Sequence, residues 1–359
     1  MNTIIKPLAV AALILSLAAC GGSGGGGSEG ASNSSAPQSL SQPTLAPSSA
    51  ESSPSEAYSG PTYAASLDLA AAQVIVEDIF SGQLLSGLEK FSKPTEDQAA
   101  APELQAMASV LGVMSKLVTR VDFSASGVQK PTSSGLRKID IDSVSACESG
   151  SFHMLGELDD NGVGTVDVTL SNCQFDNLRL DGGDVRFTMD AFDFDLLLPT
   201  LGSMSFVDVN ATLGEEQLIL SGVEDFELNV SMVDVTTNSV FNMVVHRLSD
   251  QTMLWFSDFS TETQIDISSE QVDRYFEGRI YHSGLGFTDV GMGFPLRTDF
   301  FNNSYEPPYD TGLIRFVGAN ESRIEFEASP EAVSVSIYES NAGAAVSSYD
   351  LSWSEFILP

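Results

Sequence analysis

The sequence is poor in the residues that most often carry catalysis or bind transition metals. Its 359 residues include only three histidines, which are far apart at His153, His246 and His282. No His-Glu-x-x-His motif, no paired Cys-His zinc spacing and no Ser-x-x-Lys motif occurs. The sequence therefore offers no recognisable catalytic motif and predicts neither a transition metal nor a cofactor.

Basic residues are scarce as well. The chain has 16 lysines and arginines against 49 aspartates and glutamates, which gives a formal net charge of −33 at pH 7. An acidic surface of this kind repels the phosphates of nucleic acids and anionic lipid headgroups. We therefore expect no nucleic-acid partner.

The apolar run at the amino terminus is too short to cross a bilayer, which takes a helix of about 20 residues. It extends from Leu8 to Leu17, follows the single positive charge of Lys6, and is typical of a signal peptide. The run ends in Leu17-Ala18-Ala19-Cys20, which resembles the lipobox of bacterial lipoproteins. The alternative is an ordinary secretory signal with an incidental cysteine.

The lipobox resemblance implies a chemical fate for Cys20. It implies diacylglycerol on the Cys20 sulfur, cleavage of the bond between Ala19 and Cys20, and acylation of the new amino terminus. Two or three acyl chains hold a protein to a membrane far more firmly than one. Because residue 21 is Gly21 and not Asp, the resemblance also implies the outer membrane of a Gram-negative bacterium.

A flexible tether is predicted after the anchor, over residues 20–62. Its composition is Gly, Ser, Pro, Ala, Gln and Thr, with almost no large apolar side chain. Such a segment cannot bury enough surface to offset the loss of chain entropy. Its root-mean-square reach is about 35 Å.

The two remaining cysteines, Cys147 and Cys173, are predicted to form a disulfide, because an exported chain meets oxidising conditions. The residues between them read as a hairpin, with segments 151–158 and 164–170 around an Asp-Asp-Asn-Gly turn. The acidic turn also suggests calcium. Leu170 occupies the twelfth position and excludes an EF-hand loop, but another calcium site keeps four weak candidates, Asp159, Asp160, Asp181 and Asp184.

Periodicity divides the rest of the chain into a helical part, residues 63–120, and an antiparallel β part, residues 121–359. Apolar residues at helical spacing predict helices over 67–91 and from Pro102 to Val118. Alternating runs such as 185–190 and 226–233 predict about fifteen strands. The predicted fold is mainly β: a large antiparallel curved sheet, as an open barrel or a two-layer sandwich, with two N-terminal helices packed on it.

The stretch from Gly278 to Trp353, with its glycines, the Pro307-Pro308 turn and a terminal strand bearing Trp353, is similar to uncharacterised strand-rich proteobacterial lipoproteins. These also share two spaced cysteines. The resemblance implies an architecture and a location, and no activity.

Three weaker candidates for chemistry or binding stand beside structural explanations. His282 and Ser283 are adjacent, as in part of a catalytic triad, although a lone strand histidine is usually structural. Asp193 and Asp195 share a strand face, as in a glycosidase, although 49 acids make such pairs common. A sugar-binding platform is suggested by six aromatic residues that equally suit a core: Trp255, Phe256, Phe259, Tyr275, Phe276 and Tyr281.

The sequence leaves three functional classes open. The first is a non-enzymatic envelope lipoprotein that binds a partner or supports an assembly. The second is a carrier or sensor of a lipid or another apolar ligand, and the third is a hydrolase of envelope polymers. All three are attached to the membrane through the lipid anchor, and neither a protein partner nor a ligand can be named from the sequence.

Overall fold

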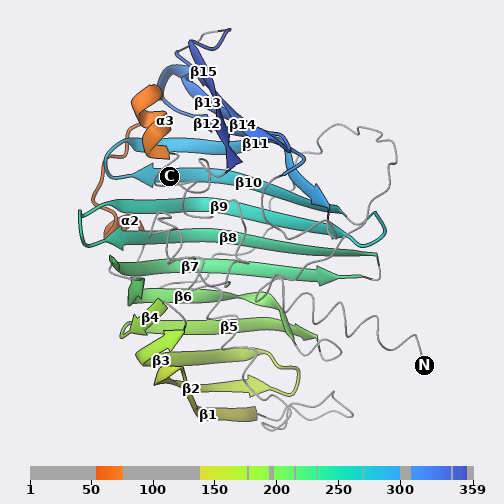
Figure 1. Ribbon diagram of the computed structural model, residues 1–359. Helices are drawn as coiled ribbons and strands as arrows, with labels where there is room; N and C mark the ends of the chain where they lie inside the picture. Colours follow the sequence, from red (N-terminus) through yellow and green to blue (C-terminus); the bar gives the residue numbers. More distant parts are fainter. Residues whose placement is uncertain are drawn as a thin grey trace.

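The computed structural model describes residues 54–75, 138–175, 178–193, 198–213, 216–231, 233–269, 271–299, 309–340 and 343–353. These residues form one large antiparallel sheet with two short α-helices, α2 (Pro54–Ala57) and α3 (Leu69–Ile75), and a 3-10 turn, η2 (Ala319–Glu321) (Figure 1). Within these ranges, no helix is both long and apolar enough to cross a membrane.

The sheet contains fifteen strands, so the predicted antiparallel, strand-rich fold is confirmed. In chain order the strands are β1 Lys138–Ala146, β2 Ser149–Asp159, β3 Gly164–Phe175, β4 Leu178–Asp181, β5 Asp184–Asp193, β6 Leu198–Leu213, β7 Glu216–Val230, β8 Asp234–Arg247, β9 Met253–Asp266, β10 Gln271–His282, β11 Gly286–Asp299, β12 Thr311–Val317, β13 Arg323–Ala328, β14 Ala332–Tyr338 and β15 Ser347–Ser352.

The topology is a meander in which each strand lies beside its neighbours in the chain. The one variation is that β4 and β5 share a single position, and both pair with β3 and β6. In the described chain, β1 and β15 stand at opposite ends of the strand order and do not pair with each other. The sheet is therefore open, and its strands are not divided between two separate sheets.

Alternation of apolar and polar residues gives the sheet two different faces. In β13, Ile324 and Phe326 are buried, and they pair with Ile337 and Val335 of β14. We call the face that carries this continuous buried core the inner face, and the opposite one the outer face. The outer face carries cross-strand ion pairs, including Arg186–Asp167, Arg279–Asp289 and Arg297–Asp273 at 2.6–2.7 Å.

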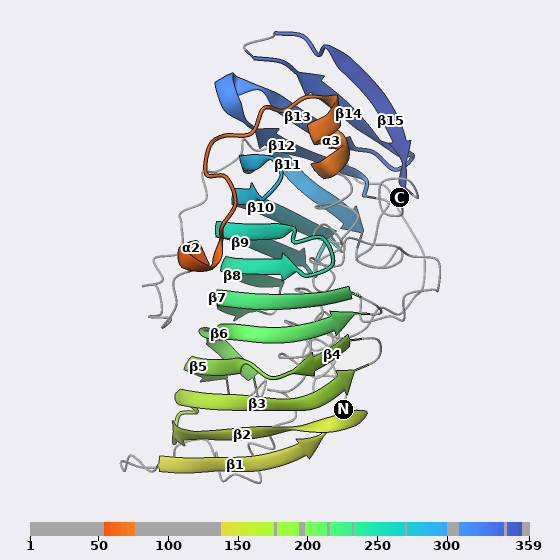
Figure 2. The same ribbon diagram turned by 90° about the vertical axis from the view of Figure 1, so that its left-hand side faces the viewer.

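The sheet is strongly curved, as Figure 2 shows, and β-bulges interrupt its register. Asp208 in β6 and Asp258 in β9 both have positive φ, of 49° and 48°. Each bulge lies beside a glycine at which a Cβ atom would stand 2.5 Å from backbone: Gly183, in the turn between β4 and β5, faces Val209, and Gly278 of β10 faces Phe259. Bulges bend a strand and increase its twist, which gives the large open sheet its curvature.

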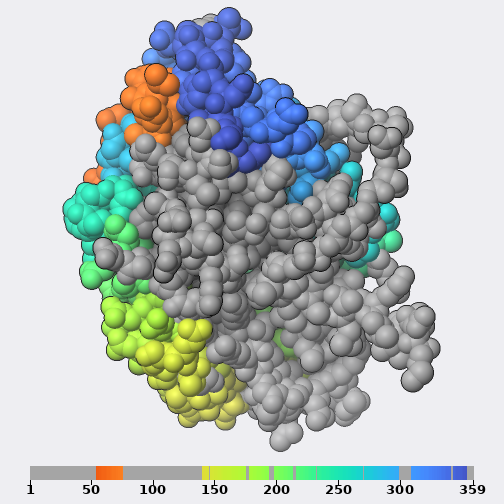
Figure 3. Space-filling model, in the orientation of Figure 1, coloured from red at the N-terminus to blue at the C-terminus, as the bar shows by residue number. Residues whose placement is uncertain are grey.

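The N-terminal segment, residues 54–75, runs from the outer face to the inner core around the ends of the strands. Helix α2 contacts β7 and β8, and α3 lies near β12–β14 (Figure 2). Between them, Ala65 N–H donates to the carbonyl of Phe287 (2.8 Å), and Ala65 carbonyl accepts from Ala319 N–H (2.6 Å). In the space-filling view the α3 part of this segment lies against the C-terminal strands, at the end of the molecule opposite β1 (Figure 3).

Two sequence expectations change here. The tether was expected to reach residue 62, but Pro54 and Tyr58 are already buried, because Tyr58 brings an aromatic ring to a segment of small polar residues. The first predicted helix, 67–91, is described only as α3. Its buried side is Ala71, Ala72 and Ile75, while Leu69 is 50% exposed. Residues 76–91 and the predicted helix from Pro102 to Val118 lie outside the described residues.

Candidate functional site

A carboxyl group is buried in the inner face of β7. Glu224 is 3% exposed and pairs with Met204 of β6 and Phe241 of β8, which both belong to the apolar core. Directly paired residues project from the same side of a sheet, so the Glu224 side chain lies among them. Ser239 Oγ donates a hydrogen bond to Glu224 Oε1 (2.9 Å), but no described residue hydrogen-bonds to the buried Oε2.

The electrostatic state of Glu224 follows from this burial. Loss of hydration raises the pKa of Glu224 to about 7. The hydrogen bond from Ser239 lowers this pKa in part, and the negative charge of Asp225 raises it further. A carboxylate in such surroundings is costly unless another group pairs with it.

Four hydroxyl residues form a polar block beside Glu224 on the same face. The block consists of Thr237 and Ser239 on β8 and Thr261 and Thr263 on β9, where Thr237 pairs with Thr263 and Ser239 with Thr261. Apolar residues surround this hydroxyl block on the inner face: Phe226, Leu228, Val235, Phe241, Phe259, Ile265 and Phe276. The block is thus a polar island within an apolar surface.

A buried arginine borders the hydroxyl block on its other side. Arg274 of β10 is 2% exposed, pairs with Thr263, and donates from Nη1 to the hydroxyl of Tyr309 (3.3 Å). Strands β8 and β9 separate Arg274 from Glu224, which corresponds to three strand spacings, or about 14 Å. Arg274 is also in register with Leu228, four residues along β7 from Glu224. The two groups are therefore too far apart to pair with each other. Glu224, the hydroxyl block and Arg274 therefore follow one another across the inner face, from β7 to β10.

Sequence analysis did not single out this inner-face site, although a signal was present. The predicted strand 226–233 has Phe226 and Leu228 on its apolar side. Extending the same alternation backward by two residues puts Glu224 on that side. Arg274 and the hydroxyl block could not be found in this way, because only the pairing of β8, β9 and β10 brings them together.

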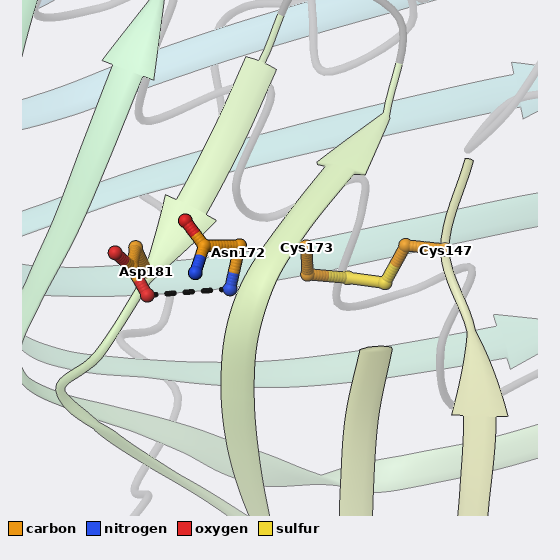
Figure 4. Close-up of a disulfide and its surroundings, with 4 residues drawn as sticks. All are labelled: Cys147, Asn172, Cys173 and Asp181. Atoms are coloured by element: carbon orange, nitrogen blue, oxygen red, sulfur yellow. Dashed lines mark hydrogen bonds between the residues drawn. A yellow bond between two sulfur atoms is a disulfide. The ribbon is translucent and has the colours of Figure 1, made fainter. Parts of the chain in front are cut away.

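The predicted disulfide is present. Cys147, which follows β1, is bonded to Cys173 of β3, and their Cα atoms are 5.4 Å apart (Figure 4). Beside it, Asn172 N–H donates to Asp181 Oδ1 (3.2 Å). The hairpin predicted between the cysteines is confirmed by the antiparallel pairing of β2 with β3. The disulfide therefore joins the first strand of the sheet to the third.

The calcium candidates do not come together in the structure. Asp159 Oδ1 accepts hydrogen bonds from Asn161 N–H (2.8 Å) and Val163 N–H (2.9 Å), so this carboxylate closes the hairpin turn. Asp181 ends β4 and Asp184 begins β5. Asp184 pairs with Thr169 of β3, which is well away from the β2–β3 turn that contains Asp159. Across the described ranges, no three histidine, cysteine or acidic side chains gather closely enough to hold a metal ion.

The histidines occupy separate places. His153 Nε2 lies 2.7 Å from Asp142 Oδ1 on the exposed surface. His246 pairs with Met253, whereas His282 Nδ1 accepts a hydrogen bond from Gly284 N–H (2.9 Å). Ser283, the suggested nucleophile, accepts one from Met253 N–H (2.9 Å). The bond to His282 closes the turn between β10 and β11, and the bond to Ser283 ties that turn to the start of β9, so both have a structural role.

The aromatic residues suggested as one platform are divided between the two faces. Phe256, Phe259 and Phe276 are buried in the inner core, whereas Trp255 and Tyr281 stack on the outer face with ring centroids 4.3 Å apart. Tyr58 packs against both of these rings at 5.8 and 5.7 Å. Successive strand residues point to opposite faces, so the six cannot form a single surface.

One suggested pair cannot be placed. Asp193 ends β5, and Asp195 lies outside the described residues.

Comparison of the chain with protein-family profiles, curated proteins and solved structures finds no match.

Proposed function

We propose that the protein is a lipid-anchored lipoprotein of the cell envelope whose sheet is a non-catalytic binding module for an amphiphilic ligand. The observation that carries the binding part is the polar island on the inner face: the hydroxyl block with Glu224 and Arg274 at its sides, surrounded by apolar side chains. Ligand sites are mostly apolar, with a few polar groups that orient the ligand. The island has this composition.

The anchoring part rests on the sequence. Lys6 and the apolar run precede Cys20, and residues 21–53 separate that cysteine from the first described residue, Pro54. Helix α2, the first described element, contacts β7 and β8. Sorting to the outer membrane of a Gram-negative bacterium completes this proposal.

A hydrolase receives less support from the geometry. His153 lies on the exposed surface, and His246 and His282 point to opposite faces of the sheet. His246 pairs with Met253, which packs with the outer-face aromatic residues, whereas His282 pairs with the core residue Leu254. A general acid or base must reach the reacting group and an orienting partner together. The described histidines share no such place.

Native mass spectrometry of the delipidated protein, isolated from its own cells, tests the binding function. We expect a co-purifying mass of a small amphiphile that organic solvent extracts. A protein with no bound mass that also fails to bind added amphiphiles would contradict the proposal.

Metabolic labelling with palmitate tests the anchor separately. We expect the native chain to be labelled and Cys20→Ser to be unlabelled. Labelling of Cys20→Ser would show that the anchor is not on this cysteine.

A further inference from the structure

Glu224 Oε2 is a buried acceptor that no described residue satisfies. In native proteins nearly all buried polar atoms have a partner, and a buried carboxylate is retained when it is paired. The other oxygen is held by Ser239, so the side chain is oriented rather than disordered. This oxygen is thus held in a fixed direction within the buried inner face.

The strands around Glu224 supply no positive charge to it. Strands β6 and β7 contain no lysine or arginine. The arginine of β8, Arg247, pairs with Asp250 at 2.6 Å, at the end of the strand six residues from Phe241, the partner of Glu224. Arg274 is farther still, because it lies three strand spacings across the sheet, about 14 Å, and four residues along it, in register with Leu228. A cation for Glu224 must therefore come from outside these strands.

The immediate neighbours of Glu224 suit an alkyl chain with a compact cationic head. Met204, Phe226 and Phe241 adjoin it on the inner face, and Phe226 also packs on Phe187 at 5.6 Å. Apolar side chains can cover a hydrocarbon chain, and phenyl faces attract cations. The net charge of −33 adds a long-range attraction for cations and a repulsion for anions.

We infer that Glu224 is the anchor for the ammonium head of a cationic amphiphile, whose alkyl chain lies on the apolar inner face beside the hydroxyl block. This inference rests on the proposed binding function and names the ligand class. The ammonium donates to Glu224 Oε2, while Ser239 keeps the carboxylate in position. No bond is made or broken, and the ligand leaves unchanged.

The test compares three probes with the same ten-carbon chain: decylammonium, decanol and decanoate. Binding to the full chain carrying Cys20→Ser is measured by titration calorimetry at pH 8. The buffer contains about 0.5 M NaCl, which reduces the screening length to about 4 Å and suppresses attraction to surface acids. We expect decylammonium to bind about 10- to 100-fold more tightly than decanol, the range of one charge-assisted hydrogen bond, and decanoate to bind most weakly.

Two variants locate the preference. Glu224→Gln keeps the shape of the side chain and is expected to abolish the preference for decylammonium over decanol, with both still bound. Glu227→Gln removes one acid from the outer face of the same strand and is expected to retain the preference for decylammonium. Ser239→Ala is expected to reduce this preference, because Glu224 then lacks the hydroxyl that positions its carboxylate.

The outcomes separate this inference from the proposed function. Equal binding of decylammonium and decanol to the native sequence, or a preference that survives in Glu224→Gln, overturns the role of Glu224 but leaves amphiphile binding standing. Failure of all three probes to bind overturns the proposed function itself. A preference lost equally in Glu227→Gln shows general attraction to acids, which also overturns the inference.

Discussion

Ser239 holds one oxygen of Glu224 across the pair of strands β7 and β8, at 2.9 Å, while the second oxygen is buried with no partner among the described residues. Glu224 therefore destabilises the native fold when it is ionised, because an unpaired buried carboxylate is far less favourable than a hydrated one. It also leads to the first prediction.

The stability of the protein is expected to fall as the pH rises from about 4.5 to about 7. The native pKa of Glu224, about 7, lies above its unfolded value of 4.5, so the unfolded chain loses its proton first. The stabilisation that comes from the proton bound to Glu224 is fully present below pH 4.5. It is lost as the pH rises through the native pKa. The cost above pH 7 is about 3 kcal/mol.

Urea unfolding of Glu224→Gln measures this cost. We expect the free energy of unfolding of the variant to exceed that of the native sequence by up to about 3 kcal/mol above pH 7. The two values should be equal near pH 4. Glu227→Gln, on the outer face of β7, is the control and should show no such pH-dependent gain. A difference of the same size at pH 4 and pH 8 would contradict the assignment to Glu224.

The disulfide is expected to stabilise the sheet at its β1 end. Cys147 and Cys173 are 26 residues apart in the sequence, and a closed loop of that length contributes about 3.5 kcal/mol in the chain-entropy treatment. The double variant Cys147→Ser, Cys173→Ser should lose this amount in urea unfolding. Reductant should lower the stability of the native chain and leave the double variant unchanged; equal sensitivity of both would argue against the disulfide.

Tyr58 is expected to hold the N-terminal segment on the sheet. The residue is 7% exposed and packs on Trp255 and Tyr281, and removing a buried aromatic side chain costs about 3 kcal/mol or more. In Tyr58→Ala, hydrogen exchange at the Ala65 amide, bonded to Phe287, should become faster. Tyr63→Ala is the matched control, since Tyr63 is 66% exposed, and unchanged exchange in Tyr58→Ala would refute the role.

Gly278 and Gly291 form a matched pair for the bulges that curve the sheet. Gly278 has φ +148°, and a Cβ there would lie 2.5 Å from Phe259 Cα, whereas a Cβ at Gly291 would meet nothing within 4 Å. Gly278→Ala should destabilise the fold by about 1–3 kcal/mol from backbone strain alone. Gly291→Ala should be neutral or slightly stabilising, and similar thermal midpoints for the two variants would disprove the requirement for glycine at 278.

The antiparallel β architecture and the disulfide could be predicted from the sequence because both depend on short-range regularities. Alternation with period two marks each strand whatever its neighbours are, and the turn at residues 159–162 sets the register of its hairpin. The predicted aromatic platform was wrong because short-range alternation also decides which face of the sheet each residue occupies. Trp255 and Phe256 are adjacent in the sequence, and in a strand that adjacency places them on opposite faces.

Tertiary structure alone decided which polar groups share a surface. Glu224, Ser239, Thr261 and Arg274 come from four strands, and nothing local to any of them indicates that they share one face. Their arrangement on that face depends on the register between β7, β8, β9 and β10. Burial, likewise, is a property of the packed sheet. In the sequence Glu224 is one of 49 acidic residues, and only its burial in the sheet raises its pKa. The sequence by itself determined the strands, through the alternation of neighbouring residues, and the acidic charge, through composition.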